Sequence, residues 1–295
     1  KKSIKLPDDS LTFIYEFLEG QEISVVATDN FDNEKDKSFI IKSPPSTVNN
    51  SQLSESLADS QRRYYALLIG VDKYMDPGIA SLNEPIKDAT LLKNVLTKKY
   101  AFKESDIMFL KNPTFEEMTI AFDSLVHKVT PNDYLLIFFA GHGDLDQRTK
   151  IGYWLPSDAT KRNTARWFRN SVLVENIRAI NSKHTILISD ACFSGNIFKS
   201  RGLENNASTG INNMMKLPSR KAITSGAQTT VPDKSVFMRY LLKYLQENDK
   251  QYLPSVDLYY SIRMAMSNNA DTVPQYGEIQ NAGDEGGDFV FYQPD

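Results

Sequence analysis

The chain has 295 residues, of which 41% are hydrophobic and 24% are charged, and this composition is typical of a globular protein. Its net charge of −3 gives no general support for binding to nucleic acid or to a membrane surface. The single cysteine excludes an internal disulfide framework and a multi-cysteine zinc site, and no apolar run approaches the roughly 18 residues of a membrane span.

The first 43 residues have the alternating pattern of short antiparallel strands. The chain begins at Lys1 without methionine or a signal peptide, which is typical of a mature or excised form. Apolar and polar residues alternate in Leu11–Tyr15 and Ile23–Ala27, and a third run, Ser38–Lys42, follows the turn-rich residues 29–33. The pattern resembles the last strands of a bacterial immunoglobulin-like repeat, and the residues that carry this resemblance are Gly20, Ile23, Val25, Ala27 and Asp29.

A polar stretch separates this β-rich, immunoglobulin-like segment (1–43) from the rest of the chain. Residues 44–62 are rich in Ser, Asn and Pro, and we interpret them as a linker. Residues 63–295 then form the main domain, which is long enough to bury a large core.

Apolar runs and helical periodicities alternate along residues 63–295. Strands are expected at Tyr64–Val71, Ile107–Leu110, Leu135–Phe139, Thr185–Ser189, Ala222–Ser225 and Asp288–Tyr292, with a short extended piece at Ile151–Leu155. Helices are expected after Pro85, which suits a first helical position, after the Thr114–Glu117 capping box, and at Val174–Ile180, 234–247 and 255–267. Residues 196–219 are polar and irregular, and they are too long for an ordinary connection.

This alternation predicts an α/β domain. Its central sheet is expected to be mainly parallel, with about six strands and with helices on both faces. Catalytic groups in such folds lie beyond the carboxyl ends of the strands.

Two of the predicted strands end beside reactive side chains. The run Leu135–Phe139 leads to His142 between two glycines, and the run Ile186–Ile188 leads to Cys192. A thiolate is a strong nucleophile that a nearby imidazole can generate, and one strand–helix–strand crossover can bring the two residues together. The backbone N–H groups of Gly143 and Cys192 are candidates for an oxyanion hole.

These residues resemble those of a known clan. The His-Gly pair after one strand, and Asp-Ala-Cys-Phe-Ser-Gly after another, are similar to the caspases, the metacaspases and their bacterial relatives. Caspases carry their histidine about 50 residues upstream of Gln-Ala-Cys-x-Gly, whereas Asp190 here replaces that glutamine, which favours the bacterial metacaspase-like side. Further similar segments are Tyr64–Asp72, Leu82–Leu92, Ala222–Ser225 and Gly287–Phe291. The resemblance implies a caspase-like three-layer sandwich and cysteine endopeptidase activity.

The same resemblance implies a substrate preference. Metacaspases line the S1 pocket with an aspartate two residues before the cysteine and with another in the first helix region, and the matching residues are Asp190 and Asp88. Two carboxylates favour a cationic side chain, so we expect cleavage after Arg or Lys. Nothing in the sequence assigns Arg166 or Arg169 to that pocket, as a preference for aspartate would require.

The loop that follows the cysteine suggests self-processing. Family members are often cleaved there, and basic residues in or next to this 196–221 region are Lys199, Arg201, Lys216, Arg220 and Lys221. The pair Asp144 and Asp146 suggests a calcium contact, but two carboxylates are too few for a site. We therefore expect no metal and no cofactor.

Alternative functions stay open at this stage. One is a catalytically inactive caspase-like module that binds or scaffolds, and another is a thiol transferase or ligase that uses the same acyl-enzyme. The expected partners are proteins or peptides with Arg or Lys at P1, and the sequence makes no prediction of the oligomeric state. An immunoglobulin-like neighbour is commoner in exported bacterial proteins, which favours a periplasmic or extracellular location.

Overall fold

The computed structural model describes residues 22–28, 34–40, 62–146, 148–149, 151–191, 198, 211–226, 234–267, 269–270 and 272–294. The chain divides into two compact units, Lys1–Asp59 and Ser60–Asp295. In the first unit, β1 (Glu22–Thr28) pairs antiparallel with β2 (Glu34–Ile40). The second strand starts four residues earlier than the sequence pattern predicts. The strand expected at Leu11–Tyr15 and the linker lie outside the described residues, apart from Arg62.

The second unit is built on a six-stranded sheet with the order β12-β10-β9-β5-β3-β4. Within this sheet, β4, β3, β5, β9 and β10 are parallel to their neighbours. Only β12, which pairs with β10, is antiparallel. This arrangement confirms the predicted mainly parallel sheet. The strands are β3 (Tyr64–Gly70), β4 (Phe102–Lys111), β5 (Tyr134–Ala140), β9 (His184–Asp190), β10 (Ser219–Thr224) and β12 (Gln275–Glu278).

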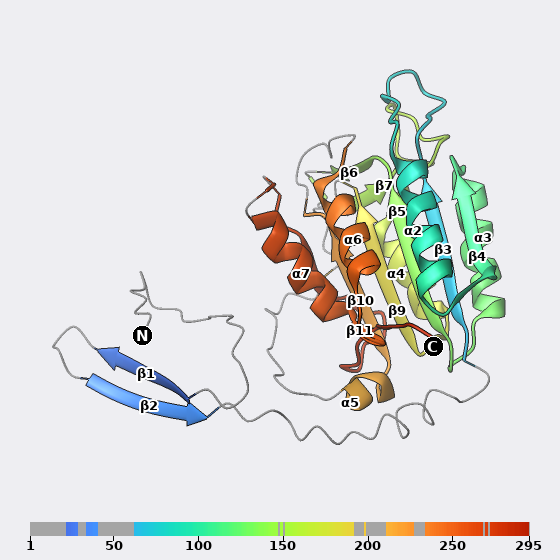
Figure 1. Cartoon of the computed structure of the whole chain (residues 1–295). Helices are drawn as coiled ribbons and strands as arrows, with labels where there is room; N and C mark the ends of the chain where they lie inside the picture. Colours follow the sequence, from blue (N-terminus) through green and yellow to red (C-terminus); the bar gives the residue numbers. More distant parts are fainter. Residues whose placement is uncertain are drawn as a thin grey trace. The chain divides into compact units, whose positions relative to one another are not determined.

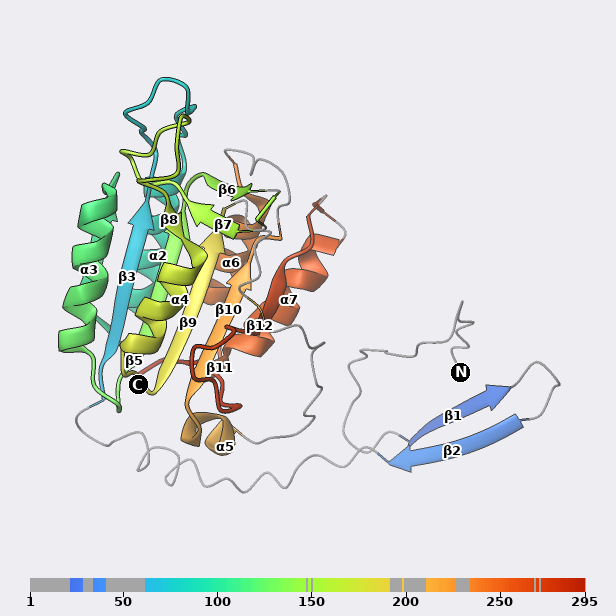
Figure 2. The same ribbon diagram turned by 180° about the vertical axis from the view of Figure 1, so that it is seen from behind.

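The central strands are continuous apolar runs because helices cover both faces of the sheet. Every residue of β3, β5 and β9 is buried. Helices α2 (Pro85–Lys99), α6 (Val236–Glu247) and α7 (Ser255–Ser267) lie on one face in Figure 1. Helices α3 (Phe115–Lys128) and α4 (Asn170–Ala179) lie on the other face, which Figure 2 shows from behind. The molecule therefore has the three layers expected of a caspase-like sandwich.

Local signals in the sequence set the starts of several helices. Pro85 is at the first helical position of α2, and Thr114 caps α3 through the predicted capping box with Glu117. Helix α4 begins at Asn170, four residues earlier than expected. The short strand Phe168–Arg169 directly precedes it. The region predicted to be irregular contains one short helix, α5 (Ile211–Lys216).

Most of the short strands are missed by the sequence pattern, but the extended piece expected at Ile151–Leu155 is present as the strand Ile151–Trp154. Strands β6 (Gly143–Asp146), β7 (Ile151–Trp154) and β8 (Phe168–Arg169) form a separate three-stranded sheet at the carboxyl end of β5. Strand β11 (Tyr252–Pro254) pairs with β13 (Val290–Tyr292), which is shorter than the predicted last strand. Only two to four residues long, these strands offer too few positions for a period to be detected.

Aromatic packing joins the small sheet to the large one. The indole of Trp154 on β7 stacks on the ring of Phe139 on β5, with 4.3 Å between the ring centroids. Both side chains are fully buried in the main core. The residues that follow β5 are therefore held in place by the core itself. Among the described residues, no helix is long and apolar enough to cross a membrane.

Candidate active site

The end of β5 leads to His142 through a glycine whose replacement would strain the backbone and crowd its neighbours. Gly141 has a φ of +154°, and a Cβ atom there would come within 3.2 Å of Phe139, of Tyr74 and of Val71. Any other residue would meet both the backbone strain and this crowding. Gly141 therefore fixes the direction in which the chain leaves the sheet.

Two contacts from the loop 72–84 hold His142. Its backbone N–H donates to the hydroxyl oxygen of Tyr74 at 2.8 Å, and its Nε2 lies 2.9 Å from the carbonyl oxygen of Ala80. A carbonyl oxygen only accepts, so Nε2 must carry the hydrogen. In the neutral imidazole, Nδ1 is then the nitrogen with the free lone pair. Sequence reasoning missed both partners, because neither a backbone carbonyl nor a tyrosine hydroxyl has a recognisable spacing from its target.

The loop that carries Ala80 is itself anchored. Ile79 packs with Leu155 and Ala159 in a small apolar cluster. The carboxylate of Asp76 accepts hydrogen bonds from the backbone N–H groups of Lys161 and Gly78, which lower its pKa. Burial raises the pKa of Tyr74, whose phenol therefore stays neutral. The acceptor for Nε2 is thus a positioned group of the fold.

The strand after His142 leaves one backbone donor free of its ladder. The N–H of Leu155 donates to the carbonyl of His142 at 3.0 Å, and Gly143 is paired with Trp154 in the antiparallel register of β6 and β7. Hydrogen-bonded and non-hydrogen-bonded pairs alternate in such a ladder. The pair Gly143–Trp154 is therefore non-hydrogen-bonded, and the N–H of Gly143 points away from β7. This orientation suits the predicted oxyanion donor.

The end of β9 carries a buried carboxylate that lacks a full set of partners. Asp190 is 4% exposed, and its Oδ1 has no hydrogen-bond partner. Burial raises the pKa of Asp190 to about 6, although the hydroxyls of Ser235 and Ser225 lower it in part. An incompletely paired carboxylate in such a place costs free energy unless a cation or a donor reaches it.

The register of the sheet aligns the two strand ends. Ala140 of β5 is paired with Asp190 of β9, and adjacent strands lie about 4.8 Å apart. His142 follows the first of these residues by two positions, and Cys192 follows the second by two positions. Cys192 itself lies outside the described residues.

Asp88 lies on the first turn of α2 and faces a groove between α2 and α6. The groove has a volume of about 640 Å³, and Asp88 and Ser235 both line it. The hydroxyl of Ser235 also lies close enough to Asp190 to influence its pKa. Ser235, a residue that the sequence did not single out, thus lines the same groove as Asp88 and lies near Asp190.

The basic residues of the sequence analysis are placed in different ways. Arg166 pairs with Asp158, and the guanidinium of Arg169 lies 5.9 Å from the ring of Tyr153. Arg220 and Lys221 were expected to flank an exposed loop, but they lie in β10 and are only 5% and 9% exposed. Their strand is paired on both sides, so they are not accessible cleavage sites in the folded chain. Lys216 on α5 is exposed, whereas Lys199 and Arg201 lie outside the described residues.

Asp146, the second residue of the acidic pair after His142, has local partners. The Oδ1 atom of Asp146 accepts hydrogen bonds from the backbone N–H groups of Arg148 and Thr149, and these lower its pKa. Within the part of the chain that the structure describes, no three His, Cys, Asp or Glu residues group closely enough to hold a metal ion.

Comparison with known proteins connects this arrangement to one family. The family model for the caspase domain, peptidase family C14, matches residues 63–281. The chain is 34% identical over 120 residues to metacaspase-1 of Kluyveromyces lactis, covering 35% of this chain and 27% of that protein. It is 34% identical over 103 residues to metacaspase-1B of Aspergillus niger, covering 31% and 23% of the two chains. The matched part spans about a quarter of these curated relatives.

Solved structures share the fold at lower identity. Caspase-1 from Spodoptera frugiperda superposes with a TM-score of 0.53 at 15% identity, covering 75% of this chain and 92% of that one. A structural-genomics protein from Geobacter sulfurreducens superposes with a TM-score of 0.51 at 14% identity, covering 79% and 95%. The sheet, its helical layers and the family match to residues 63–281 agree, and the chain belongs to the caspase-domain family of cysteine-type peptidases.

Proposed function

We propose that this chain is a cysteine endopeptidase that cleaves peptide bonds after Arg or Lys. The observation that carries the proposal is the buried carboxylate of Asp190, which has an unpartnered oxygen and ends β9 two residues before the only cysteine. Its strand is in register with the strand that delivers His142. These observations support the proposal that the nucleophile, the base and an anionic S1 pocket lie at one edge of the sheet.

The reaction follows from the groups at that edge. Nδ1 of His142 takes the thiol proton of Cys192, and the thiolate attacks the substrate carbonyl carbon. The N–H groups of Gly143 and Cys192 stabilise the oxyanion of the tetrahedral intermediate. The imidazolium then gives its proton to the leaving amine, which leaves an acyl-enzyme. His142 next activates a water molecule, which releases the carboxylic acid and the thiol.

The carbonyl of Ala80 contributes to both proton transfers. Because it accepts from Nε2, it fixes the tautomer in which Nδ1 is free to take a proton. It also stabilises the positive charge that forms on the ring during each transfer. These steps use only side chains and backbone groups, so we propose that the enzyme needs no cofactor.

The specificity rests on charge. A substrate guanidinium or ammonium group supplies the counter-charge that the buried Asp190 lacks. Asp88 adds a second carboxylate on the groove that Ser235 also lines. An aspartate at P1 would instead bring a third carboxylate to this place, which is unfavourable. The substrates are therefore proteins or peptides with Arg or Lys at P1.

Self-processing is part of the same proposal, at a narrower set of positions than the sequence suggested. The strand position of Arg220 and Lys221 leaves Lys199, Arg201 and Lys216 as the candidate cleavage points between the two halves of the sheet. Cleavage there would separate the strands that carry the dyad from β10 and the elements after it.

The proposal is tested with a matched set of internally quenched peptides that differ only at P1. Peptides with Arg and Lys should be cleaved, and peptides with citrulline, Gln or Asp should not. Cys192→Ala should abolish cleavage without changing the circular dichroism spectrum, and an Arg chloromethylketone should label the wild-type chain only. Mass spectrometry of the incubated chains locates any self-cleavage. Turnover by the Cys192→Ala variant, or cleavage after Asp alone, would overturn the proposal.

A further inference from the structure

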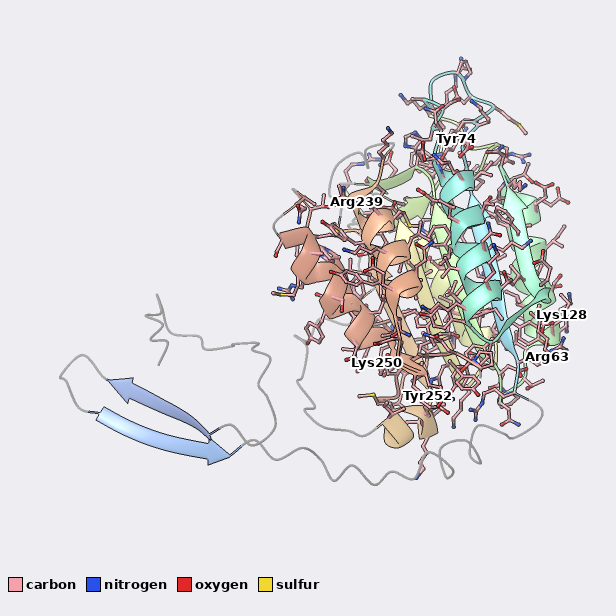
Figure 3. All side chains as sticks on the ribbon, viewed as in Figure 1. Arg63, Tyr74, Lys128, Arg239, Lys250 and Tyr252 are labelled. Atoms are coloured by element: carbon pink, nitrogen blue, oxygen red, sulfur yellow. The ribbon has the colours of Figure 1, made fainter. Side chains whose placement is uncertain are left out.

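The groove between α2 and α6 has two walls of different charge. We call it the α2–α6 groove and define it by Glu84, Lys87 and Asp88 on one wall and by Lys234, Ser235, Arg239 and Lys243 on the other. Figure 3 labels Arg239 near the end of the molecule where Tyr74 also lies, whereas Lys128 lies toward the opposite end. Arg239 thus lies toward the active-site edge of the sheet.

Two cations of the basic wall have no acidic partner among the ion pairs of the described residues. Lys87 pairs with Glu84 at 2.8 Å, and Lys243 lies 3.9 Å from Glu247. The guanidinium of Arg239 instead lies 4.8 Å from the ring centre of Tyr240, the next residue on its own helix. Lys234 and Arg239 are both exposed, so both charges are available to an incoming group.

The position of these cations is unfavourable for the helix that carries them. Helix α6 begins at Val236, so Arg239 lies in its first turn and Lys234 precedes its N-cap, Ser235. The amino end of a helix carries a partial positive charge, which favours acidic residues and disfavours basic ones. The first turn of α6 contains no acidic residue. Two cations and the helix dipole together create a positive field at this point of the groove.

Ser235 connects this field to the specificity pocket. Its hydroxyl influences Asp190, and Arg239 follows one helical turn later, about 6 Å along the helix axis. An extended peptide carries side chains on one face every two residues, about 7 Å apart. A substrate with its basic P1 residue at Asp190 therefore has a nearby side chain within reach of the basic wall.

We propose that the α2–α6 groove is an accessory subsite that binds an acidic side chain of the substrate close to the basic P1 residue. The preferred substrate is then a peptide in which Arg or Lys lies within a few residues of Asp or Glu. This inference rests on the proposed function, because it assumes that Asp190 binds the P1 cation. It adds a second requirement to the basic P1 residue, namely an acidic residue nearby in the substrate.

The experiment scans one Asp through positions P4 to P2′ of an internally quenched Arg-P1 peptide, with Asn at the same position as the neutral reference. One position should raise kcat/KM about fivefold over Asn at low salt, and the gain should shrink toward onefold at 0.5 M NaCl. The variants Arg239→Gln and Lys234→Gln should each lower the Asp-to-Asn ratio, and Arg239→Glu should invert it. The control variant Lys128→Gln removes one charge far from the groove and should keep the wild-type ratio.

The outcomes separate the two proposals. Equal cleavage of the Asp and Asn peptides at every position, with Arg at P1 still required, would overturn the subsite and leave the peptidase intact. Failure to cleave any Arg or Lys peptide would overturn the proposed function. In that case the same peptides are bound to the Cys192→Ala chain and followed by fluorescence anisotropy. If the Asp peptide binds more weakly to the Cys192→Ala chain that also carries Arg239→Gln than to the chain with Cys192→Ala alone, the subsite is still supported. Equal binding to the two chains would refute it.

Discussion

The charge of the Asp190 carboxylate lowers the stability of the fold, whereas the proposed function requires that charge for substrate binding. Burial raises its pKa to about 6, above the value of 3.8 that is usual for aspartate. Between about pH 4 and pH 6 the folded chain therefore holds a proton that the unfolded chain has released. The free energy of unfolding should fall as the pH rises through this window and then stay level. Under the proposed function, the charge of this costly group is what binds the basic P1 side chain.

The variant Asp190→Asn tests this conflict. At pH 7.5 it should be more stable than the wild type by up to about 3 kcal/mol, because it removes the cost of a buried charge whose pKa is shifted by about two units. The gain should disappear below about pH 3, where Asp190 is protonated in both the folded and the unfolded wild type. Denaturant unfolding at several pH values measures this difference.

Activity should change in the opposite direction. Asp190→Asn should lower kcat/KM for Arg-P1 peptides by about 100-fold or more, mainly through KM. The matched control is Asp288→Asn, a buried carboxylate on the chain before β13 that accepts hydrogen bonds from Ser255, Tyr276 and Val256. Asp288→Asn should destabilise the fold at pH 7.5. A destabilised Asp190→Asn variant would contradict the assignment of an unpaired charge.

At the scale of elements, the loop 72–84 positions the histidine. The loop leaves the end of β3 and reaches across to the end of β5, where Tyr74 and Ala80 contact His142. Its anchor is the small cluster of Ile79, Leu155 and Ala159 rather than the main core. Tyr74 and Ala80 therefore fix the position of His142, the proposed base.

The variant Tyr74→Phe tests this positioning role. It keeps the ring that packs 5.2 Å from the imidazole and removes only the hydroxyl that accepts from the His142 N–H. We expect kcat to fall about tenfold with KM nearly unchanged, together with a loss of about 1 kcal/mol of stability. The control Tyr100→Phe removes a buried hydroxyl that donates to the carbonyl of Leu245, away from the site. If both variants lose stability and keep the same kcat, Tyr74 is only structural.

Elements with long patterns or strong caps could be predicted from the sequence, and short ones could not. The runs that became β3, β5 and β9 are apolar because both faces of the sheet are covered, and the capping box of Thr114 and Glu117 marks the start of α3. Strands β6 and β8 and helix α5 contain residues such as GDLD, FR and INNMMK, whose patterns specify nothing by themselves. Pairing with neighbours determines their conformation.

The same division applies to the site. His142, Cys192 and Asp190 could be proposed because each follows a recognisable strand and has reactive chemistry. Ser235 and Ala80 could not, because they reach the site from elements that are distant along the chain and act through a hydroxyl or a backbone oxygen. The burial of Arg220 and Lys221 could not be predicted from the sequence either. Their charges suggested a loop, but Arg220 donates to the carbonyl groups of Ser182 and Ser219, and Lys221 pairs with Asp284.

At the scale of the whole chain, the unit Ser60–Asp295 contains all that the proposed reaction requires. It holds the six-stranded sheet, the covering helices and the strand ends that carry the site. Its first described residues are already part of its packing. Arg63 pairs with Asp106, and the guanidinium of Arg62 lies 5.1 Å from the ring centre of Tyr134.

A chain that begins at Ser60 should therefore keep both fold and activity. We expect its melting temperature to agree with that of the full chain within about 2 °C, and its kcat/KM for Arg-P1 peptides to agree within about twofold. The control begins at Ala66 and removes two residues of β3, including Tyr64, whose hydroxyl donates to the carbonyl of Val290. That control should unfold at a much lower temperature, since it loses a buried aromatic side chain and part of a central strand. A Ser60 chain that folds normally but has lost its activity would show that residues 1–59 contribute to catalysis.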